Sequence, residues 1–213
     1  MLIRAGLLAI LVVSGAVRLG AEEVSVLVLA PTAGDDRVEP ARAAIAFWNA
    51  TLADLGLDLR LVGPEIRVVP AETRALETYA RQLATRATQR LPTAGFEPDA
   101  PAAFDALGRD IVLLLSRQDI MSFTWTLPGS DPPRHFIVVR AAGRAYRSDP
   151  MVSSHVVAHE LGHALGLEHN GEAHTLMCGP CQPLTAAPDD AGFLPLPDGD
   201  GARLRALHPT AHR

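Results

Sequence analysis

Histidines at fixed spacing mark the part of the chain most able to do chemistry: residues 159–169 read HELGHALGLEH. His159 and His163 are four residues apart in a segment with the apolar stripe of a helix. Both imidazoles therefore leave the same helix face, about one turn apart. That spacing lets two ring nitrogens reach one metal ion at ~2.0–2.1 Å. The pair predicts two ligands of a metal site.

The residues that follow supply the rest of the site. Gly166 is expected to end the helix, because a residue without a Cβ can adopt a positive φ and reverse the chain. His169 can then return as the third ligand, and three neutral imidazoles leave the fourth zinc position open, as in catalytic sites. Glu160 cannot easily be a ligand, but it can reach water at the metal. The sequence thus predicts one catalytic Zn²⁺ with Glu160 as the catalytic residue.

The same string resembles the HExxHxxGxxH motif of the metzincin zinc metallopeptidases, and most closely that of the matrixins. Met177 follows His169 by eight residues, the spacing of the matrixin Met-turn. In that turn it would form the apolar floor beneath the zinc. A looser likeness covers most of residues 24–208, through the segments IAFWN (45–49), RDIVLLLS (109–116) and LPDGDGARLRAL (196–207).

The resemblance implies an α+β, zincin-like domain with a mixed twisted sheet, an active-site helix and a Met-turn. It also implies a secreted zinc-dependent endopeptidase. Glu160 would take a proton from zinc-activated water and pass it to the leaving amine. The substrate would be a protein or peptide that pairs in extended form with an edge strand, for which we expect FTWTL at 123–127.

Several residues depart from the matrixin pattern. Asn170 follows the third histidine where matrixins usually carry Ser or Thr, and Cys178 follows Met177 where they usually carry Tyr. Structural Ca²⁺ is possible but unsupported, because the Asp-Gly pairs at 198–201 lack the later Glu of a calcium-binding loop. Subfamily, structural calcium and zymogen control therefore stay open.

Two other functions remain open. Cys178 and Cys181 form a CGPC motif typical of thiol oxidoreductases, but that function needs a strand before the motif and a helix after it. Here the motif follows the expected Met-turn and precedes a Pro-rich loop, so we predict a structural disulfide instead. The second alternative is an exported zinc-binding protein without protease activity.

Composition excludes several classes of protein. The 213 residues are 48% hydrophobic with a net charge of −5, so the chain is neither disordered nor fibrous. Its 19 basic residues are all Arg, scattered along an acidic chain, and do not suggest a nucleic-acid surface. We expect a monomer whose partners are substrates rather than nucleic acids.

The first 21 residues have the features of a secretory signal peptide: Arg4 in a positive n-region, a short apolar stretch, and small residues before Glu22. Cleavage would fall after Ala16 or Ala21, and residues 22–213 would form one metallopeptidase domain. No other stretch reaches membrane-spanning length. We therefore expect an exported protein, extracellular or periplasmic.

Hydrophobic periodicity predicts an alternation of strands and helices around these motifs. His155, one turn before His159, is expected to line the cleft, and the Pro-rich segment 92–108 is expected to be a loop. The predicted strands are 24–30, 57–62, 110–116, 123–127 and 136–140, and the predicted helices are 40–55, 71–91, 149–165 and 201–207.

Overall fold

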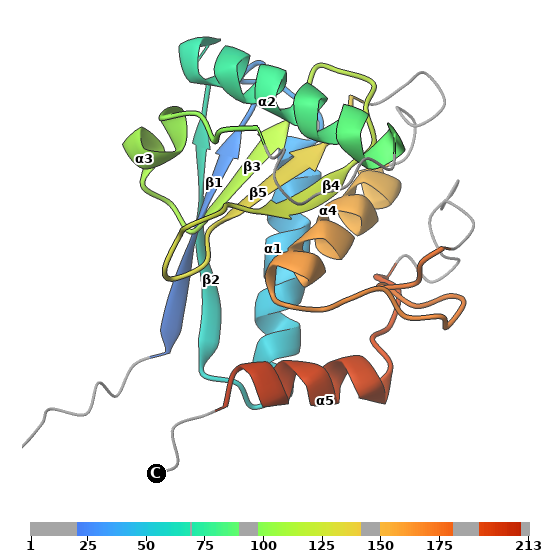
Figure 1. Ribbon diagram of the computed structural model, residues 1–213. Helices are drawn as coiled ribbons and strands as arrows, with labels where there is room; N and C mark the ends of the chain where they lie inside the picture. The colour runs from blue at the N-terminus through green and yellow to red at the C-terminus, as the bar shows by residue number, and fades with distance from the viewer. Residues whose placement is uncertain (1–20, 69, 90–97, 142–149, 181–191, 210–213) are drawn as a thin grey trace, which may run out of the picture.

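A computed structural model describes residues 21–68, 70–89, 98–141, 150–180 and 192–209 (Figure 1). The predicted leader, apart from Ala21, lies outside the described residues, and so does Cys181. No helix in the described part of the chain is both long enough and apolar enough to cross a membrane.

A five-stranded mixed sheet has the order β2-β1-β3-β5-β4. Four strands are parallel, and β4 alone runs antiparallel, at the edge next to β5. The predicted edge position of residues 123–127 is therefore confirmed. The strands are β1 (Glu22–Leu29), β2 (Leu59–Arg67), β3 (Ile111–Leu115), β4 (Phe123–Thr126) and β5 (His135–Val139).

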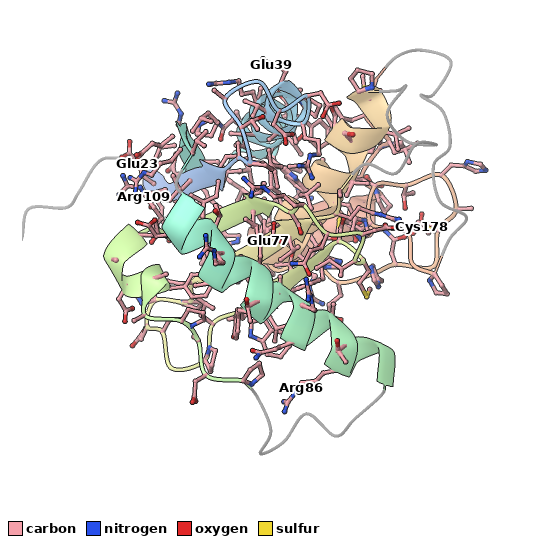
Figure 2. The ribbon with its side chains drawn as sticks, turned by 90° about the horizontal axis from the view of Figure 1, so that it is seen from above. Glu23, Glu39, Glu77, Arg86, Arg109 and Cys178 are labelled. Carbon is pink, nitrogen blue, oxygen red and sulfur yellow. The ribbon has the colours of Figure 1, made fainter. Side chains whose placement is uncertain are left out.

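Helices cover both faces of this sheet. One face packs against α1 (Val38–Asp54) and α4 (Pro150–Ala164), and α5 (Asp198–Leu207) joins the same apolar cluster through Leu204. The other face packs against α2 (Pro70–Gln89) and the short α3 (Ala103–Leu107), and Figure 2 shows α2 lying across it. β3 reads IVLLL and is buried throughout, as expected of a central strand covered on both sides.

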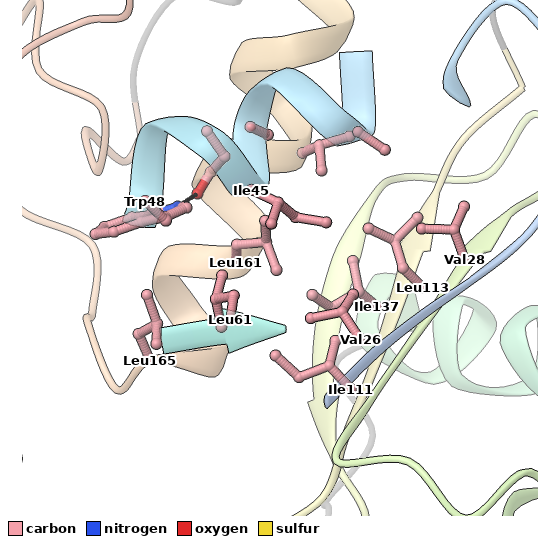
Figure 3. Packing of buried hydrophobic residues seen from close by; sticks show 14 of the residues in the cluster. Val26, Val28, Ile45, Trp48, Leu61, Ile111, Leu113, Ile137, Leu161 and Leu165 are labelled. Atoms are coloured by element: carbon pink, nitrogen blue, oxygen red, sulfur yellow. Dashed lines mark hydrogen bonds between the residues drawn. The ribbon is translucent and has the colours of Figure 1, made fainter. Parts of the chain in front are cut away.

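The helix that carries His159 and His163 is fixed against α1. The Trp48 indole donates a hydrogen bond of 2.8 Å from Nε1 to the carbonyl oxygen of Ala158, and the Trp48 side chain is fully buried (Figure 3). Leu161 and Leu165 pack into the same apolar cluster. Together these contacts fix both the rotation and the height of α4 beneath the sheet.

Three element predictions differ from the structure: β2 continues to Arg67 instead of ending at 62, and two helices differ as well. Residues 103–107 form α3 inside the segment expected to be a loop, because Phe104 and Leu107 bury their side chains against α2 and the sheet. Helix α5 begins at Asp198 rather than 201, so the Asp-Gly pairs form its first turn. Gly and Pro suppress the local helical signal at both places, and tertiary packing overrides that weak preference.

Candidate metal centre

The three predicted histidines lie together. His159 and His163 come from α4, and His169 comes from the loop after it. Their Nε2 atoms are 3.2 Å apart between His159 and His163, 3.1 Å between His159 and His169, and 3.2 Å between His163 and His169. Among the described residues, this is the one group of three or more His, Cys, Asp or Glu side chains close enough to share an ion.

Backbone carbonyl groups fix the proton position on two of the rings. Nδ1 of His159 is 2.7 Å from the carbonyl oxygen of Leu176, and Nδ1 of His163 is 2.9 Å from that of Leu167. A carbonyl oxygen only accepts hydrogen bonds, so both Nδ1 atoms must carry the proton. Both Nε2 atoms then present lone pairs, which is the tautomer a metal ligand needs.

The geometry fits a zinc ion. Ligand nitrogens at ~2.0–2.1 Å from a tetrahedral zinc lie about 3.3–3.4 Å apart, close to the spacing observed here. Without a cation, the lone pairs of His159 and His163 would face each other at 3.2 Å, a repulsive arrangement. Burial lowers the pKa of His159 to about 4 and also lowers that of His163, with the neighbouring imidazoles adding to both effects. The rings are therefore held neutral, ready to bind a cation.

The chain reversal that brings His169 back begins at Gly166. This residue has a φ of 93°, in the left-handed region that favours glycine. The Gly166 amide donates to the carbonyl of His163, and the Leu167 amide donates to the carbonyl of Gly162. This is the hydrogen-bond pattern of a helix closed by a left-handed residue.

Met177 lies in a turn that packs against α4 at Gly162. Its side chain is fully buried, and a Cβ on Gly162 would come within 2.5 Å of its Sδ. Only glycine at 162 lets the methionine approach so closely. The preceding residue, Leu176, supplies the carbonyl that orients His159. The turn therefore packs against α4 through the Met177 side chain and orients His159 through the backbone of Leu176.

Asn170, the residue that departs from the matrixin pattern, connects three parts of the site. Its amide donates to the carbonyl of Met177, and its side-chain Nδ2 donates to Asp200 on α5 at 2.8 Å. Its Oδ1 accepts a hydrogen bond from the Thr175 hydroxyl at 3.0 Å. Sequence reasoning identified Asn170 only as a departure, although a polar residue next to a ligand is a signal for such a role.

Glu160 is buried, with 6% of its surface exposed. Its Oε2 accepts a hydrogen bond of 2.9 Å from the hydroxyl of Thr124 on β4. Burial raises the pKa of Glu160 to about 7, and the hydrogen bond from Thr124 opposes part of that rise. A carboxyl group with this pKa can both accept and release a proton near neutral pH. Thr124 was not singled out in the sequence.

Cys178 is disulfide-bonded. Its amide donates to the carbonyl of Thr175, and it forms an isolated parallel bridge with Asn170. The segment before the CGPC motif is thus a turn rather than the strand that a thioredoxin-type motif needs. The second cysteine of the chain, Cys181, lies outside the described residues.

The position of His155 one turn before His159 suggested that it lines the cleft, but the structure buries it instead. Its ring is 3% exposed, Nδ1 lies 2.8 Å from the carbonyl of Met151, and Nε2 accepts a hydrogen bond from the amide of Leu194. The ring also lies against Phe193. His155 therefore holds the segment around 192–196 onto α4.

No protein-family model matches this chain, and no curated protein matches it significantly. Among solved structures, the archaemetzincin of Methanopyrus kandleri is similar with 15% sequence identity and a TM-score of 0.46. The match covers 90% of this chain and 98% of that one. Similarity at this level carries no argument about activity, so the function must be argued from the residues of the site.

Proposed function

We propose that this protein is a zinc-dependent endopeptidase of the metzincin type. The observation that carries the proposal is the convergence of three Nε2 atoms, two of them fixed as lone-pair donors, on a helix that also carries the buried carboxyl group of Glu160. Three histidine ligands leave one zinc position open, which distinguishes catalytic from structural sites. The buried turn at Met177 would be the counterpart of the Met-turn.

Metal binding and proton transfer would be carried out by different residues of the site. His159, His163 and His169 would hold the ion, which supplies Lewis-acid polarisation of a peptide carbonyl and a lower pKa for water. Glu160 would accept a proton from the attacking water and return it to the leaving amine nitrogen. Burial raises the pKa of Glu160, which makes its carboxylate a better proton acceptor than an exposed one.

The free edge of β4 would bind the substrate. In the described residues β4 pairs with β5 on one side only, so its other edge offers unpaired backbone groups to an extended peptide. The contact between Thr124 and Glu160 sets that edge next to the catalytic carboxyl group. A peptide paired there would have its backbone beside the metal ligands.

We also propose that the enzyme acts outside the cytoplasm, as a monomer. The leader-like residues 1–21 and the disulfide at Cys178 support export, since disulfides persist in oxidising compartments. Assignment to the matrixins rather than to another metzincin family rests on the position of Met177 and on the looser likeness of three segments, whereas Asn170 and Cys178 depart from the matrixin pattern.

The test is metal content and cleavage measured on one preparation of protein lacking the leader. We expect one zinc per chain, cleavage of casein, and loss of both on His163→Ala, because two ligands hold zinc poorly. His174→Asn is the control: His174 is exposed, and asparagine tolerates its positive φ of 62°. Full zinc in the His163→Ala variant would refute the site, whereas zinc without any cleavage would favour the non-catalytic zinc-binding function.

A further inference from the structure

The hydroxyl group of Thr124 contacts Glu160 at two points. Its Oγ1 is 2.7 Å from the backbone carbonyl oxygen of Glu160 and 2.9 Å from the carboxyl Oε2. The two residues are 36 positions apart in sequence, one on the edge strand and the other on the metal-binding helix. A single side chain thus connects these two elements at the candidate catalytic residue.

This contact restricts how the carboxyl group can turn. Among the described residues, Thr124 provides the one side-chain hydrogen bond to Glu160, and it engages Oε2 rather than Oε1. With Oε2 held, the carboxyl plane is fixed and Oε1 keeps one orientation. Because Glu160 is buried, bulk water competes little for the same oxygen, so the bond holds better than it would on a surface.

A threonine hydroxyl suits this task because it has one proton and can also accept. Its proton can point to Oε2 or to the backbone carbonyl oxygen of Glu160, since both lie within hydrogen-bond distance of Oγ1. The same side chain therefore ties the carboxyl group to the helix backbone that carries it.

The position of Thr124 also connects this contact to the substrate-binding edge. Thr124 lies within β4 and is paired with Ile137 of β5 on one side. A peptide added on the other side would immobilise the β4 backbone from both sides. Since the Thr124 side chain reaches Glu160 from that backbone, pairing of the substrate would also steady the carboxyl group.

We propose that Thr124 is a positioning residue that orients the Glu160 carboxyl group and couples it to peptide pairing at β4. This inference rests on the proposed endopeptidase function. It assigns the Thr124 hydroxyl an effect on turnover rather than on zinc binding, because the hydroxyl contacts Glu160 and none of the histidine ring nitrogens.

The test compares Thr124→Val, which keeps the shape and strand preference but removes the hydroxyl, with Thr124→Ser, which keeps the hydroxyl. We expect Thr124→Val to lower kcat by about 10–100-fold, as removal of outer-shell partners does elsewhere. The zinc content should stay near that of the wild type, any change in KM should be smaller than that in kcat, and the thermal midpoint should fall only as far as the loss of one part-buried hydrogen-bond donor requires. Thr124→Ser should restore most of kcat. Thr78→Val is the control, since it removes an exposed hydroxyl-to-backbone bond on α2.

A crystal structure of each zinc-loaded variant provides a readout that does not depend on activity. We expect one Glu160 carboxyl orientation in the wild type and in Thr124→Ser, and a rotated or multiple orientation in Thr124→Val. If the wild type cleaves peptides and Thr124→Val cleaves equally well, the inference is wrong while the endopeptidase function stands. If neither the wild type nor any variant cleaves peptides, the proposed endopeptidase function is wrong. An unchanged orientation of the Glu160 carboxyl group in the Thr124→Val crystals would overturn the inference as well.

Discussion

The side-chain amide of Asn170 donates a 2.8 Å hydrogen bond to the carboxylate of Asp200, which is itself buried in the first turn of α5. This bond ties the residue after the third histidine to the closing helix of the chain. Through this bond α5 supports the loop that carries His169, although α5 lies far from the metal ligands in the sequence.

Replacing Asp200 with Ala should destabilise the protein by about 1–3 kcal/mol, because the Asn170 amide loses its partner in a part-buried place. Zinc affinity should fall as well, since the loop that carries His169 loses an anchor. Asp198→Ala is the matched control from the same turn, as Asp198 is exposed. Chemical denaturation and competition with a chromophoric chelator measure the two effects; equal results for the two variants would contradict this role.

Replacing Gly162 with Ala should destabilise the protein even though alanine is the better helix former. The new methyl group would meet Met177 Sδ at 2.5 Å, and overpacking of this kind costs about 1–3 kcal/mol, more than the helix preference of up to about 1 kcal/mol returns. Gly171→Ala is the control, because nothing lies within 4 Å of its added Cβ. Thermal unfolding measures both, and a Gly162→Ala variant as stable as wild type would show that the turn moves freely.

Glu160→Gln should remove turnover while keeping zinc, and it should also change stability with pH. The folded-state pKa of Glu160, about 7, lies above its ordinary value of 4.5. Its contribution to stability is therefore full below pH 4.5 and is lost as the pH rises through about 7. In zinc-free protein at pH 8, the Gln variant should be more stable than the wild type by about 1–3 kcal/mol, and the gap should close toward pH 5.

Denaturant titrations from pH 5 to pH 8 measure that gap, and single-turnover cleavage on the zinc-loaded proteins measures the loss of rate. General acid–base catalysis contributes about 10²–10⁴-fold, so we expect a loss in that range. A Gln variant with full zinc that cleaves within a few-fold of the wild type would refute the assigned role of Glu160.

The metal-free protein should also lose stability in acid through His159. Its folded-state pKa of about 4 lies below the ordinary 6.5, so its contribution is present above pH 6.5 and is lost as the pH falls toward 4. His159→Asn should flatten this decline by about 1–3 kcal/mol, since the Asn side chain can still donate to Leu176 and carries no titrating group. Unfolding curves at pH 4.5 and pH 7 for both chelator-treated proteins measure the difference; parallel declines would contradict it.

The sequence alone predicts those features of the fold and of the site that depend on residues close together in the chain. The interval of four residues between His159 and His163 predicts their common face from helix geometry alone, and Gly166 predicts the reversal that follows. The sheet and its edge strand were also predictable, because β3 is a continuous apolar run and residues 123–127 alternate. These features depend on neighbours within about one turn or one strand.

The rest depends on contacts between distant residues. Nothing in FTWTL indicates that its first threonine reaches a glutamate 36 residues away, because that contact exists only once α4 lies beneath β4. The bond between Asn170 and Asp200 likewise requires α5 to return to the metal-binding loop. The burial that raises the pKa of Glu160 is a property of the assembled layers, so it has no signature in the residues around it.

The two carbonyl groups that orient the imidazoles of His159 and His163 belong to the backbone of Leu176 and Leu167. The metal-binding tautomer is therefore selected by the position of two backbone carbonyl groups and not by the identity of any side chain. Any residue that follows the same path offers the same acceptor. Substitutions at these two buried positions would therefore act through packing, while the carbonyl groups that set the protonation of the histidines would remain.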